Sequence, residues 1–186
     1  MSTAQEELII LVDEQDNQIG TAPKLASHHQ LTPLHRAFSC FVFDDAGRFL
    51  VTRRARSKKV FPGIWTNSCC GHPAPGEPMA AAIQRRLQFE LGMRADQIKI
   101  ALPDFRYTAR YRKIVENELC PVYLARTSEQ PKSNPAEVAD WLWLPWAEWL
   151  DEIKRRPWRY STWSRKETGL LTALPQLGAE LGLELL

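Results

Sequence analysis

Two adjacent cysteines, Cys69 and Cys70, lie in the stretch NSCCGHP and could carry chemistry. Such a pair could ligate a metal, form half of a disulfide, fill buried space, or place a reactive thiol beside a metal. The four cysteines of the chain have neither the spacing of a disulfide framework nor a CxxC pair. We therefore expect thiols, some of them catalytic, and no structural zinc ribbon.

The four histidines are the next candidates: His28, His29, His35 and His72. His28 and His35 lie seven residues apart in a polar, proline-containing stretch, and His72 follows the cysteines. Neutral imidazole is the commonest protein ligand for divalent transition metals. The alternative is that these histidines lie at the surface or contact a substrate.

Two carboxylates stand two residues apart in VENELCP, at Glu116 and Glu118. In a strand they point to the same face, where they repel each other unless a cation or a proton lies between them. A solvated strand face is the alternative. Three histidines with two carboxylates would form a mixed nitrogen and oxygen set that suits Mn, Mg, Fe or Zn in octahedral geometry.

Residues 71–93, GHPAPGEPMAAAIQRRLQFELGM, resemble the Nudix box, a loop-helix-loop that binds a divalent cation and a diphosphate. Glu90 lies where a helix carboxylate can hold a metal. Two positions at which Nudix hydrolases place metal-binding glutamates carry Arg86 and Phe89 instead. The loss of two carboxylates weakens the site that activates water, so the resemblance implies the fold and argues against hydrolysis.

A basic run, TRRARSKK, follows a strand-like segment and precedes the cysteine motif. It is either a solvated face or, with Lys24 and Arg86, a clamp for a diphosphate, because Arg and Lys bind phosphate well. Among seven tryptophans, the four between positions 141 and 149 are most simply core residues. Trp163 and Tyr107 could instead face a developing cation, and packing is the alternative.

The elements that position these residues follow from the apolar pattern. We expect strands at 8–12 and after the turn DEQDNQIG, a hairpin over 38–54, and strands at 105–111 and 116–126. A helix is predicted from Glu77 to Gly92, another from near Pro145, and a terminal helical tail over about 164–186, broken near Pro175. The chain is therefore expected to be one α+β domain, residues 1–186, with a mixed sheet flanked by helices.

The composition is that of a globular protein with 44% hydrophobic and 25% charged residues. A net charge of +2 in 186 residues does not indicate nucleic-acid binding. The acidic N-terminal segment lacks the pattern of a signal peptide, and no run reaches membrane-spanning length. We therefore expect a cytoplasmic protein.

These motifs occur in one order, which resembles the type 1 isopentenyl-diphosphate delta-isomerase family of the Nudix superfamily. The order is Lys24, His28, His35, TRRARSKK, FPGIWTNSCCGHP, the degenerate Nudix box, DFRY, VENELCPV and PWRYSTW. The resemblance covers roughly residues 28–163. It implies a metal-dependent isomerase of isoprenoid biosynthesis that interconverts isopentenyl and dimethylallyl diphosphate.

The resemblance also assigns residues. It implies a first metal site, for Mn²⁺, Zn²⁺ or Mg²⁺, formed by His28, His35, His72, Glu116 and Glu118. It implies a second ion, Mg²⁺, held by the diphosphate, by Glu90 and by the backbone carbonyl of Cys70. The diphosphate clamp falls on Lys24, Arg54, Lys58 and Arg86, and the catalytic and alkene-lining residues fall on Cys70, Glu118, Tyr107 and Trp163.

The implied reaction protonates an alkene to a tertiary carbocation and removes a proton from its other side. We expect Glu118, with Tyr107 nearby, to deliver the proton and the thiolate of Cys70 to remove it, with the roles exchanged in reverse. Mg²⁺ and basic residues are expected to lower the pKa of the Cys70 thiol. Cys69 is expected to be a small buried neighbour.

Two other functions remain open at this point. A Nudix pyrophosphohydrolase would release phosphate-containing products, and a metal- or diphosphate-binding module would show no turnover. The partner expected in each case is a small-molecule diphosphate, and we expect a monomer or weak homodimer. The N-terminal segment is expected to close over the site and to order His28 and His35.

Overall fold

The computed structural model describes residues 7–174. In chain order the elements are β1 (Leu8–Val12), β2 (Gln18–Pro23), α1 (Lys24–Ser27), β3 (His35–Arg36), β4 (Phe38–Phe43), β5 (Phe49–Arg54), β6 (Trp65–Thr66), β7 (Cys69–Gly71), α2 (Met79–Leu91), β8 (Gln97–Leu102), β9 (Arg106–Tyr111), β10 (Ile114–Leu119), β11 (Val122–Arg126), β12 (Val138–Leu144), α3 (Trp146–Arg155), the 3-10 turn η1 (Pro157–Arg159) and α4 (Thr162–Thr172). The predicted α+β class is confirmed. The expected tail beyond residue 174 and the first six residues lie outside this range.

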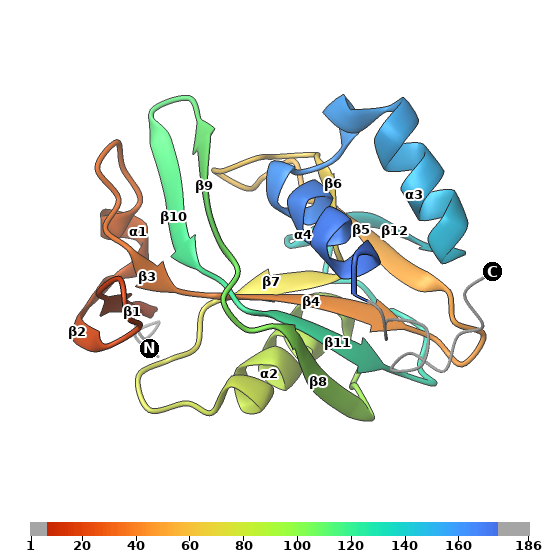
Figure 1. Ribbon diagram of the computed structural model, residues 1–186, viewed down its shortest axis with the longest axis horizontal. Coiled ribbons are helices and arrows are strands. Elements are labelled where there is room, and N and C mark those ends of the chain that lie inside the picture. The colour runs from red at the N-terminus through yellow and green to blue at the C-terminus, as the bar shows by residue number, and fades with distance from the viewer. Residues whose placement is uncertain (1–6, 175–186) are drawn as a thin grey trace.

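The strands form two sheets (Figure 1). One has the order β2-β1-β3-β10-β9, and the other has the order β12-β5-β4-β11-β8, with β6 paired to β5 and β7 paired to β4. Two chain segments pass from the first sheet to the second, β3 into β4 and β10 into β11. They run side by side, because the amides of Ala37 and Ser39 donate to the carbonyls of Leu119 and Pro121 at 2.9 and 3.1 Å. Residues just before and just after this crossing therefore come close to one another.

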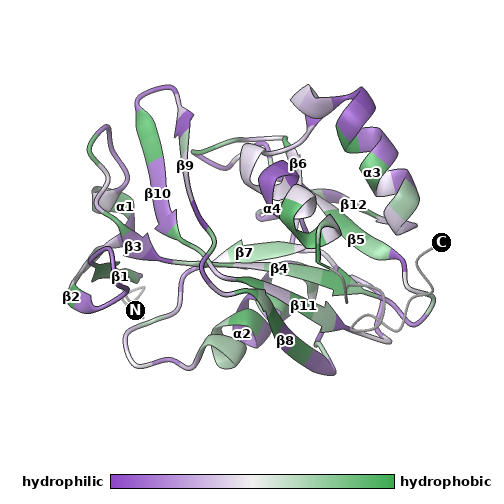
Figure 2. Cartoon of the chain, in the orientation of Figure 1, coloured by the Kyte–Doolittle hydropathy of each residue, from purple (hydrophilic) through white to green (hydrophobic). Residues whose placement is uncertain are grey.

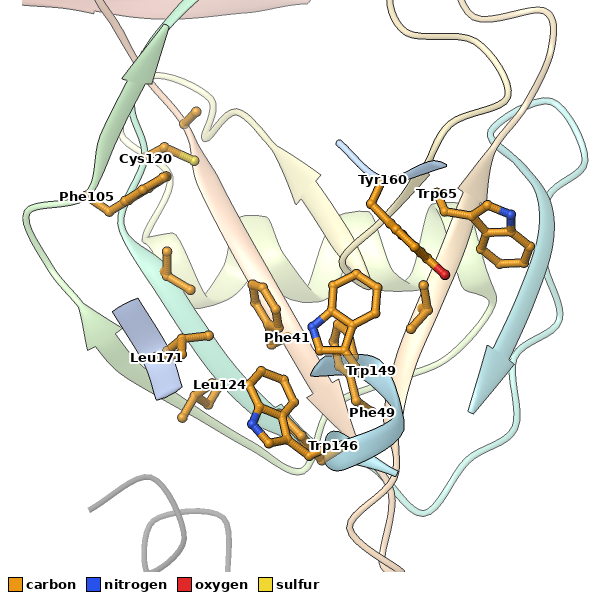
Figure 3. Close-up of a cluster of buried hydrophobic side chains, with 14 residues drawn as sticks. Phe41, Phe49, Trp65, Phe105, Cys120, Leu124, Trp146, Trp149, Tyr160 and Leu171 are labelled. Carbon is orange, nitrogen blue, oxygen red and sulfur yellow. The ribbon is translucent and has the colours of Figure 1, made fainter. Parts of the chain in front are cut away.

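Both faces of the second sheet are covered, which explains why β4 reads as a continuous apolar run. Alternate residues of β4, including Cys40, pack with α2, whereas Phe41 and Phe43 pack with α3 and α4 (Figure 3). Figure 2 shows β4 and β5 as largely hydrophobic, while β10 changes from hydrophobic to hydrophilic along its length. The polar half of β10 is the part that leads to the crossing.

The helix predicted at 77–92 is present but starts later than expected. It begins at Met79, after Pro78, and Glu77 instead accepts hydrogen bonds from the guanidinium of Arg85, with Nη2 to Oε2 at 2.7 Å. It ends where Gly92 takes a left-handed conformation, with φ of 59°. A side chain there would meet the carbonyl oxygen of Lys132 at 2.9 Å, so glycine is required by both conformation and space.

Two other predicted elements have different bounds in the structure. The strand expected at 116–126 is two strands, because the chain changes sheets at Cys120 and Pro121 and proline cannot donate to a ladder. The last helix begins at Thr162 rather than near 164, since the hydroxyl of Ser161 accepts from the amide of Ser164 and caps it. The strand at 8–12, the hairpin over 38–54 and the helix after Pro145 are confirmed, whereas the second strand begins at Gln18, inside the predicted turn DEQDNQIG. No helix within residues 7–174 is long and apolar enough to cross a membrane.

Candidate active site

One row of side chains runs across the first sheet, just before the chain passes from β3 into β4 and from β10 into β11. Glu118 on β10 pairs with His35 on β3 and with Tyr107 on β9, so the three side chains share a face. His72 reaches the same place from the end of β7, with Nε2 at 3.2 Å from Oε1 of Glu118 and 3.2 Å from Nε2 of His35. His28, which follows α1, brings its Nε2 to 3.1 Å from Oε2 of Glu116.

Backbone carbonyls fix the protonation of two of these rings. Nδ1 of His28 lies 2.5 Å from the carbonyl of Lys24, and Nδ1 of His35 lies 2.9 Å from the carbonyl of Pro33. A carbonyl can only accept, so both Nδ1 atoms carry a proton, and the two Nε2 atoms point toward the carboxylates of Glu116 and Glu118. Nitrogens and carboxylate oxygens can lie this close to one another only with a cation or a proton among them.

The charges of the buried groups agree with this interpretation. Burial lowers the pKa of His72, which favours the neutral ring that can act as a ligand. Burial opposes ionisation of Glu118, but hydrogen bonds from His35 and His72 outweigh it and hold the pKa of this carboxyl well below its usual range. The site therefore offers an ionised Glu118 and a neutral His72, whereas at His28 burial is outweighed by the hydrogen bond and charge of Glu116, which raise the pKa of this ring.

The residues fit a divalent metal ion. Ligand atoms of His28, His35, His72 and Glu118 all lie within 4.8 Å of one another, as the ligands of one ion must. Oε2 of Glu116 is buried and makes no hydrogen bond of good geometry with the described residues, although His28 is 3.1 Å away. His29 is exposed, and its Nδ1 accepts instead from the amide of Leu31. The structure thus brings four of the five predicted ligands within reach of one ion, places Glu116 against His28, and leaves His29 outside.

The two adjacent cysteines point to opposite faces of the second sheet. Cys69 packs among the residues under α2, whereas Cys70 lies beside Ser39, its partner on β4, with Sγ to Oγ at 3.4 Å. Successive residues of a strand alternate in this way, so a disulfide between them is excluded, and all four cysteines are free. Cys69 is a buried neighbour, as expected, and Cys70 alone faces α4.

Asn67 joins Cys70 to the aromatic residues of the site. Its side chain lies 3.2 and 3.3 Å from Sγ of Cys70, through Nδ2 and Oδ1, and its Oδ1 accepts from Nε1 of Trp163 at 3.2 Å. Trp163 stacks on Tyr107 with ring centroids 5.7 Å apart. A continuous chain of contacts therefore runs from Glu118 through Tyr107, Trp163 and Asn67 to Cys70.

The pKa of the Cys70 thiol differs from the sequence expectation. Burial and then the carboxylate of Glu167 raise it to about 12, while hydrogen bonds from Ser39 and Asn67 act in the other direction. None of these groups is basic, so the expectation that basic residues lower the pKa of the Cys70 thiol is wrong for the metal-free protein. Burial also raises the pKa of Tyr107 well above its usual value, so the phenol keeps its proton.

Two residues of the predicted clamp meet at one carboxylate. Lys58 and Arg86 both pair with Glu137, Arg86 through Nη2 at 3.2 Å, and Arg86 also pairs with Glu90 at 2.5 Å. Burial raises the pKa of Glu137, but Lys58 and Arg86 outweigh it and keep this carboxyl ionised. Gly71 permits the approach of α2, because a side chain there would meet Cγ of Arg86 at 2.9 Å.

The other two clamp residues make separate contacts. Lys24 pairs with Glu7 at 3.0 Å. Arg54 donates to the carbonyl of Val60 at 3.0 Å through Nη2. The structure therefore brings Lys58 and Arg86 to one carboxylate, pairs Lys24 with Glu7, and turns Arg54 to the loop that follows it.

Sequence reasoning missed four residues of the site. Asn67 and Ser39 contact Cys70. Glu137 forms ion pairs with Lys58 and Arg86. Phe61 packs edge-on against Trp163, with ring centroids 5.2 Å apart. Asn67 lies within the cysteine motif, and its spacing gave the only available signal. The others are common residue types in strands and loops that acquire a role only through tertiary contacts.

Comparison with known proteins identifies the family. A family model for the NUDIX domain matches residues 33–164. The chain is 52% identical over 169 residues to the isopentenyl-diphosphate Delta-isomerase of Agromyces mediolanus, covering 90% of this chain and 82% of that protein. It is 48% identical over 172 residues to the isopentenyl-diphosphate Delta-isomerase of Mycolicibacterium vanbaalenii, covering 92% and 94%. This chain belongs to the isopentenyl-diphosphate Delta-isomerase family.

The resemblance seen in the sequence is therefore confirmed. Solved structures agree on the fold of this family member. A protein of Deinococcus radiodurans superposes with a TM-score of 0.62 at 23% identity, over 81% of this chain and 90% of that one. A NUDIX hydrolase of Alicyclobacillus acidocaldarius gives 0.60 at 14% identity, over 82% and 97%. At these identities the likeness establishes the Nudix fold and nothing about the reaction.

Proposed function

We propose that this protein is a metal-dependent isomerase that interconverts isopentenyl diphosphate and dimethylallyl diphosphate, through a tertiary carbocation, in isoprenoid biosynthesis. One observation carries the proposal. A carboxyl group, Glu118, and a thiol, Cys70, are linked through one stacked aromatic pair, Tyr107 and Trp163. Names of relatives at about half identity support the same activity.

The reaction explains why both groups are needed. Moving a double bond by one carbon requires one proton to be added and another to be removed, and general acid–base groups each contribute about 10²–10⁴-fold. Glu118 and the phenol of Tyr107 together form the donor side; the proton is held on the phenol, because the Glu118 carboxyl is ionised. The Cys70 thiolate takes the proton on the other side, and the roles exchange in the reverse direction.

The aromatic pair protects the intermediate. A tertiary cation in water is captured, whereas an indole ring presents an electron-rich face without a nucleophile. Trp163 is 4% exposed and has its Nε1 bonded to Asn67, so the ring is held in place. A desolvated cation–π contact contributes about 2 kcal/mol.

Binding of the diphosphate is assigned to Lys24, Arg54, Lys58 and Arg86. Lys58 and Arg86 share the carboxylate of Glu137, and this common anionic partner supports the assignment. Arginine and lysine bind phosphate oxygens through charge-assisted hydrogen bonds. Binding energy from this remote group fixes the alkene relative to Glu118 and Cys70.

Metal binding is assigned to two places. His28, His35, His72, Glu116 and Glu118 would hold a divalent ion, Mn²⁺, Zn²⁺ or Mg²⁺, and the close approach of four of their ligand atoms supports this assignment. Glu90 and the carbonyl of Cys70 would hold Mg²⁺ with the diphosphate. When bound, these ions supply positive charge that keeps Glu118 oriented and neutralises the substrate. Four free thiols agree with a cytoplasmic location, which belongs to the proposal together with a monomer or weak homodimer.

The test is to incubate the purified protein with isopentenyl diphosphate and Mg²⁺ in D₂O and to follow the reaction by NMR. Dimethylallyl diphosphate with deuterium on carbon, and no released phosphate, is the expected result. Release of phosphate or a monophosphate would indicate a Nudix hydrolase instead. Unchanged substrate after addition of Mn²⁺ and Zn²⁺ in turn would leave a binding module as the better explanation.

A further inference from the structure

Phe61 lies in the loop that joins β5 to β6, and its backbone conformation is unusual. Its φ is 49°, in the left-handed region that a bulky aromatic residue rarely adopts. The chain is tied on both sides of it, because the carbonyl of Val60 accepts from Nη2 of Arg54 at 3.0 Å and the amide of Gly63 donates to the carbonyl of Arg54 at 3.1 Å. Backbone strain of this kind persists only where the surroundings enforce it, and it gathers at functional sites. The conformation therefore indicates a role for the side chain that it positions.

The ring of Phe61 connects two other elements of the molecule. It packs against Trp163 on α4 with ring centroids 5.2 Å apart, and against Tyr111 at the end of β9, also at 5.2 Å. Figure 1 shows the loop between β5 and β6 reaching toward β9. Trp163 in turn stacks on Tyr107 of the same strand. The four rings therefore form an arc that begins and ends on β9.

The arc spans one small residue of β9. Tyr107, Ala109 and Tyr111 alternate with exposed residues along the strand, so their side chains share one face of the sheet. On β10, Glu118 is the cross-strand partner of Tyr107, and Glu116 is the partner of Ala109. Cross-strand partners lie on the same face. The aromatic arc therefore stands beside the proposed metal site and on the same side of the sheet as Glu118.

Exposure to solvent falls along the arc from Phe61 to Trp163. Phe61 and Tyr111 are half-buried, whereas Trp163 is 4% exposed. The ring of Phe61 thus covers part of the buried indole and itself borders on solvent. A phenyl ring has an electron-rich face and no lone pair, so it can lie beside a cation without bonding to it. Phe61 therefore has the position and the chemistry of a barrier between water and the proposed cation site.

We propose that Phe61 is a specificity-determining residue for the isomerisation, whose ring keeps water away from the carbocation held beside Trp163. The inference rests on the proposed function, because that reaction forms the cation. Two new products can form from it. Loss of a proton from carbon gives dimethylallyl diphosphate. Alternatively, the oxygen of a water molecule bonds to the tertiary carbon and then loses a proton, which gives a tertiary alcohol diphosphate. Exclusion of water favours the first product.

The experiment incubates the metal-loaded full chain with isopentenyl diphosphate in ¹⁸O-labelled water and measures the products by NMR and mass spectrometry. Wild type should form dimethylallyl diphosphate without detectable alcohol. Phe61→Ala and Phe61→Gly should form the ¹⁸O-labelled tertiary alcohol as at least about one-tenth of the product. Phe61→Tyr keeps a ring and should behave as wild type does. Trp158→Ala is the control and should also match wild type, because Trp158 is 75% exposed on η1.

Phe61→Gly separates loss of the ring from loss of the loop. Glycine adopts a positive φ without strain, so it should hold the backbone of the loop at least as well as alanine does. The urea midpoint of Phe61→Gly should therefore be no lower than that of Phe61→Ala. Alcohol formed by both variants then reports the missing ring, whereas alcohol from Phe61→Ala alone would report a disturbed loop and overturn the inference.

Hydrogen exchange at Trp163 measures the same shielding without turnover. The Nε1–H signal of Trp163, assigned by its loss in Trp163→Phe, should exchange with solvent at least about tenfold faster in Phe61→Gly than in wild type. Unchanged exchange, or faster exchange without alcohol in an active variant, would overturn the inference and leave the proposed function intact. A wild-type protein that leaves isopentenyl diphosphate unchanged would refute the proposed function and the inference with it.

Discussion

Glu118 and Glu167 are two buried carboxyl groups in one molecule with opposite surroundings. Glu118 is 6% exposed and has two histidine rings on its carboxylate, with Nε2 of His72 at 3.2 Å and Nε2 of His35 at 3.6 Å. These partners hold its pKa well below the usual range. Glu167 is 0% exposed and lacks such partners, and burial raises its pKa to about 8.

The difference shows that partners, not burial alone, decide the charge of a carboxyl group. Burial acts in the same direction at both residues, but at Glu118 the histidine rings outweigh it. Environments that push the pKa values of two carboxyl groups apart allow one molecule to use one group as an anion and the other as a neutral acid. Glu118 is thus suited to hold a cation, whereas Glu167 is suited to stay a neutral acid. Four experiments test this contrast and the site around it.

The largest effect is expected for Glu118→Gln. Glu118 serves as both metal ligand and proton donor in the proposal, so kcat should fall by about 10⁴-fold. Glu116→Gln is the matched variant, since Glu116 contacts only His28 within the metal cluster. Excess Mn²⁺ should restore much of the activity of Glu116→Gln and none of that of Glu118→Gln. Equal rescue of both variants would refute a proton-transfer role for Glu118.

Cys70→Ala should lower kcat by about 10³-fold, because it removes the thiolate and leaves the binding residues in place. Cys69→Ala changes the adjacent thiol, on the other face of the sheet, and should retain most activity. The isomerisation rate of each variant, measured by NMR, tests both expectations. A reversed order of the two cysteines would contradict the assignment.

His35→Ala should weaken Mn²⁺ binding by at least about tenfold, since it removes one imidazole from the cluster. His29→Ala is the control, because His29 is exposed and outside the cluster. Calorimetric titration of metal-free protein gives the affinities. If both variants bound Mn²⁺ as wild type does, the proposed metal site would be wrong.

Glu167→Gln should change stability in a pH-dependent way. The folded-state pKa of Glu167 is raised from 4.5 to about 8, so the folded protein keeps a proton that the unfolded chain loses. Stability from this group is therefore full at low pH and falls as pH rises from about 4.5 to about 8. Urea unfolding should show the variant gaining at least about 1 kcal/mol over wild type between pH 5 and 8. A constant difference across that range would contradict the raised pKa.

Several parts of the fold could be predicted because their signals are local. The hairpin over 38–54, the strand at 8–12 and the helix after Pro145 depend on neighbouring apolar and turn residues. The predicted bounds of strands and helices were wrong where tertiary contacts decide them. Pro121 lies where the chain leaves one sheet for the other, so a continuous apolar pattern contains two strands.

The sequence by itself determined which chemical groups the protein contains and which family it belongs to. Cys70, Glu118 and the three clustered histidines stand in a fixed order, and residue type together with spacing is enough to recognise that order. Side-chain alternation in a strand also placed Glu116 and Glu118 on one face. These properties depend only on covalent chemistry and local backbone geometry.

Tertiary structure decided what each group does. It separated Cys69 from Cys70 by the two faces of a sheet, gave Glu118 two histidine partners, and left Glu167 without any of comparable strength. It also raised the pKa of Cys70 to about 12, where the sequence led us to expect a lower value. Charge state depends on burial and on partners from distant parts of the chain, and neither is encoded in the neighbouring residues.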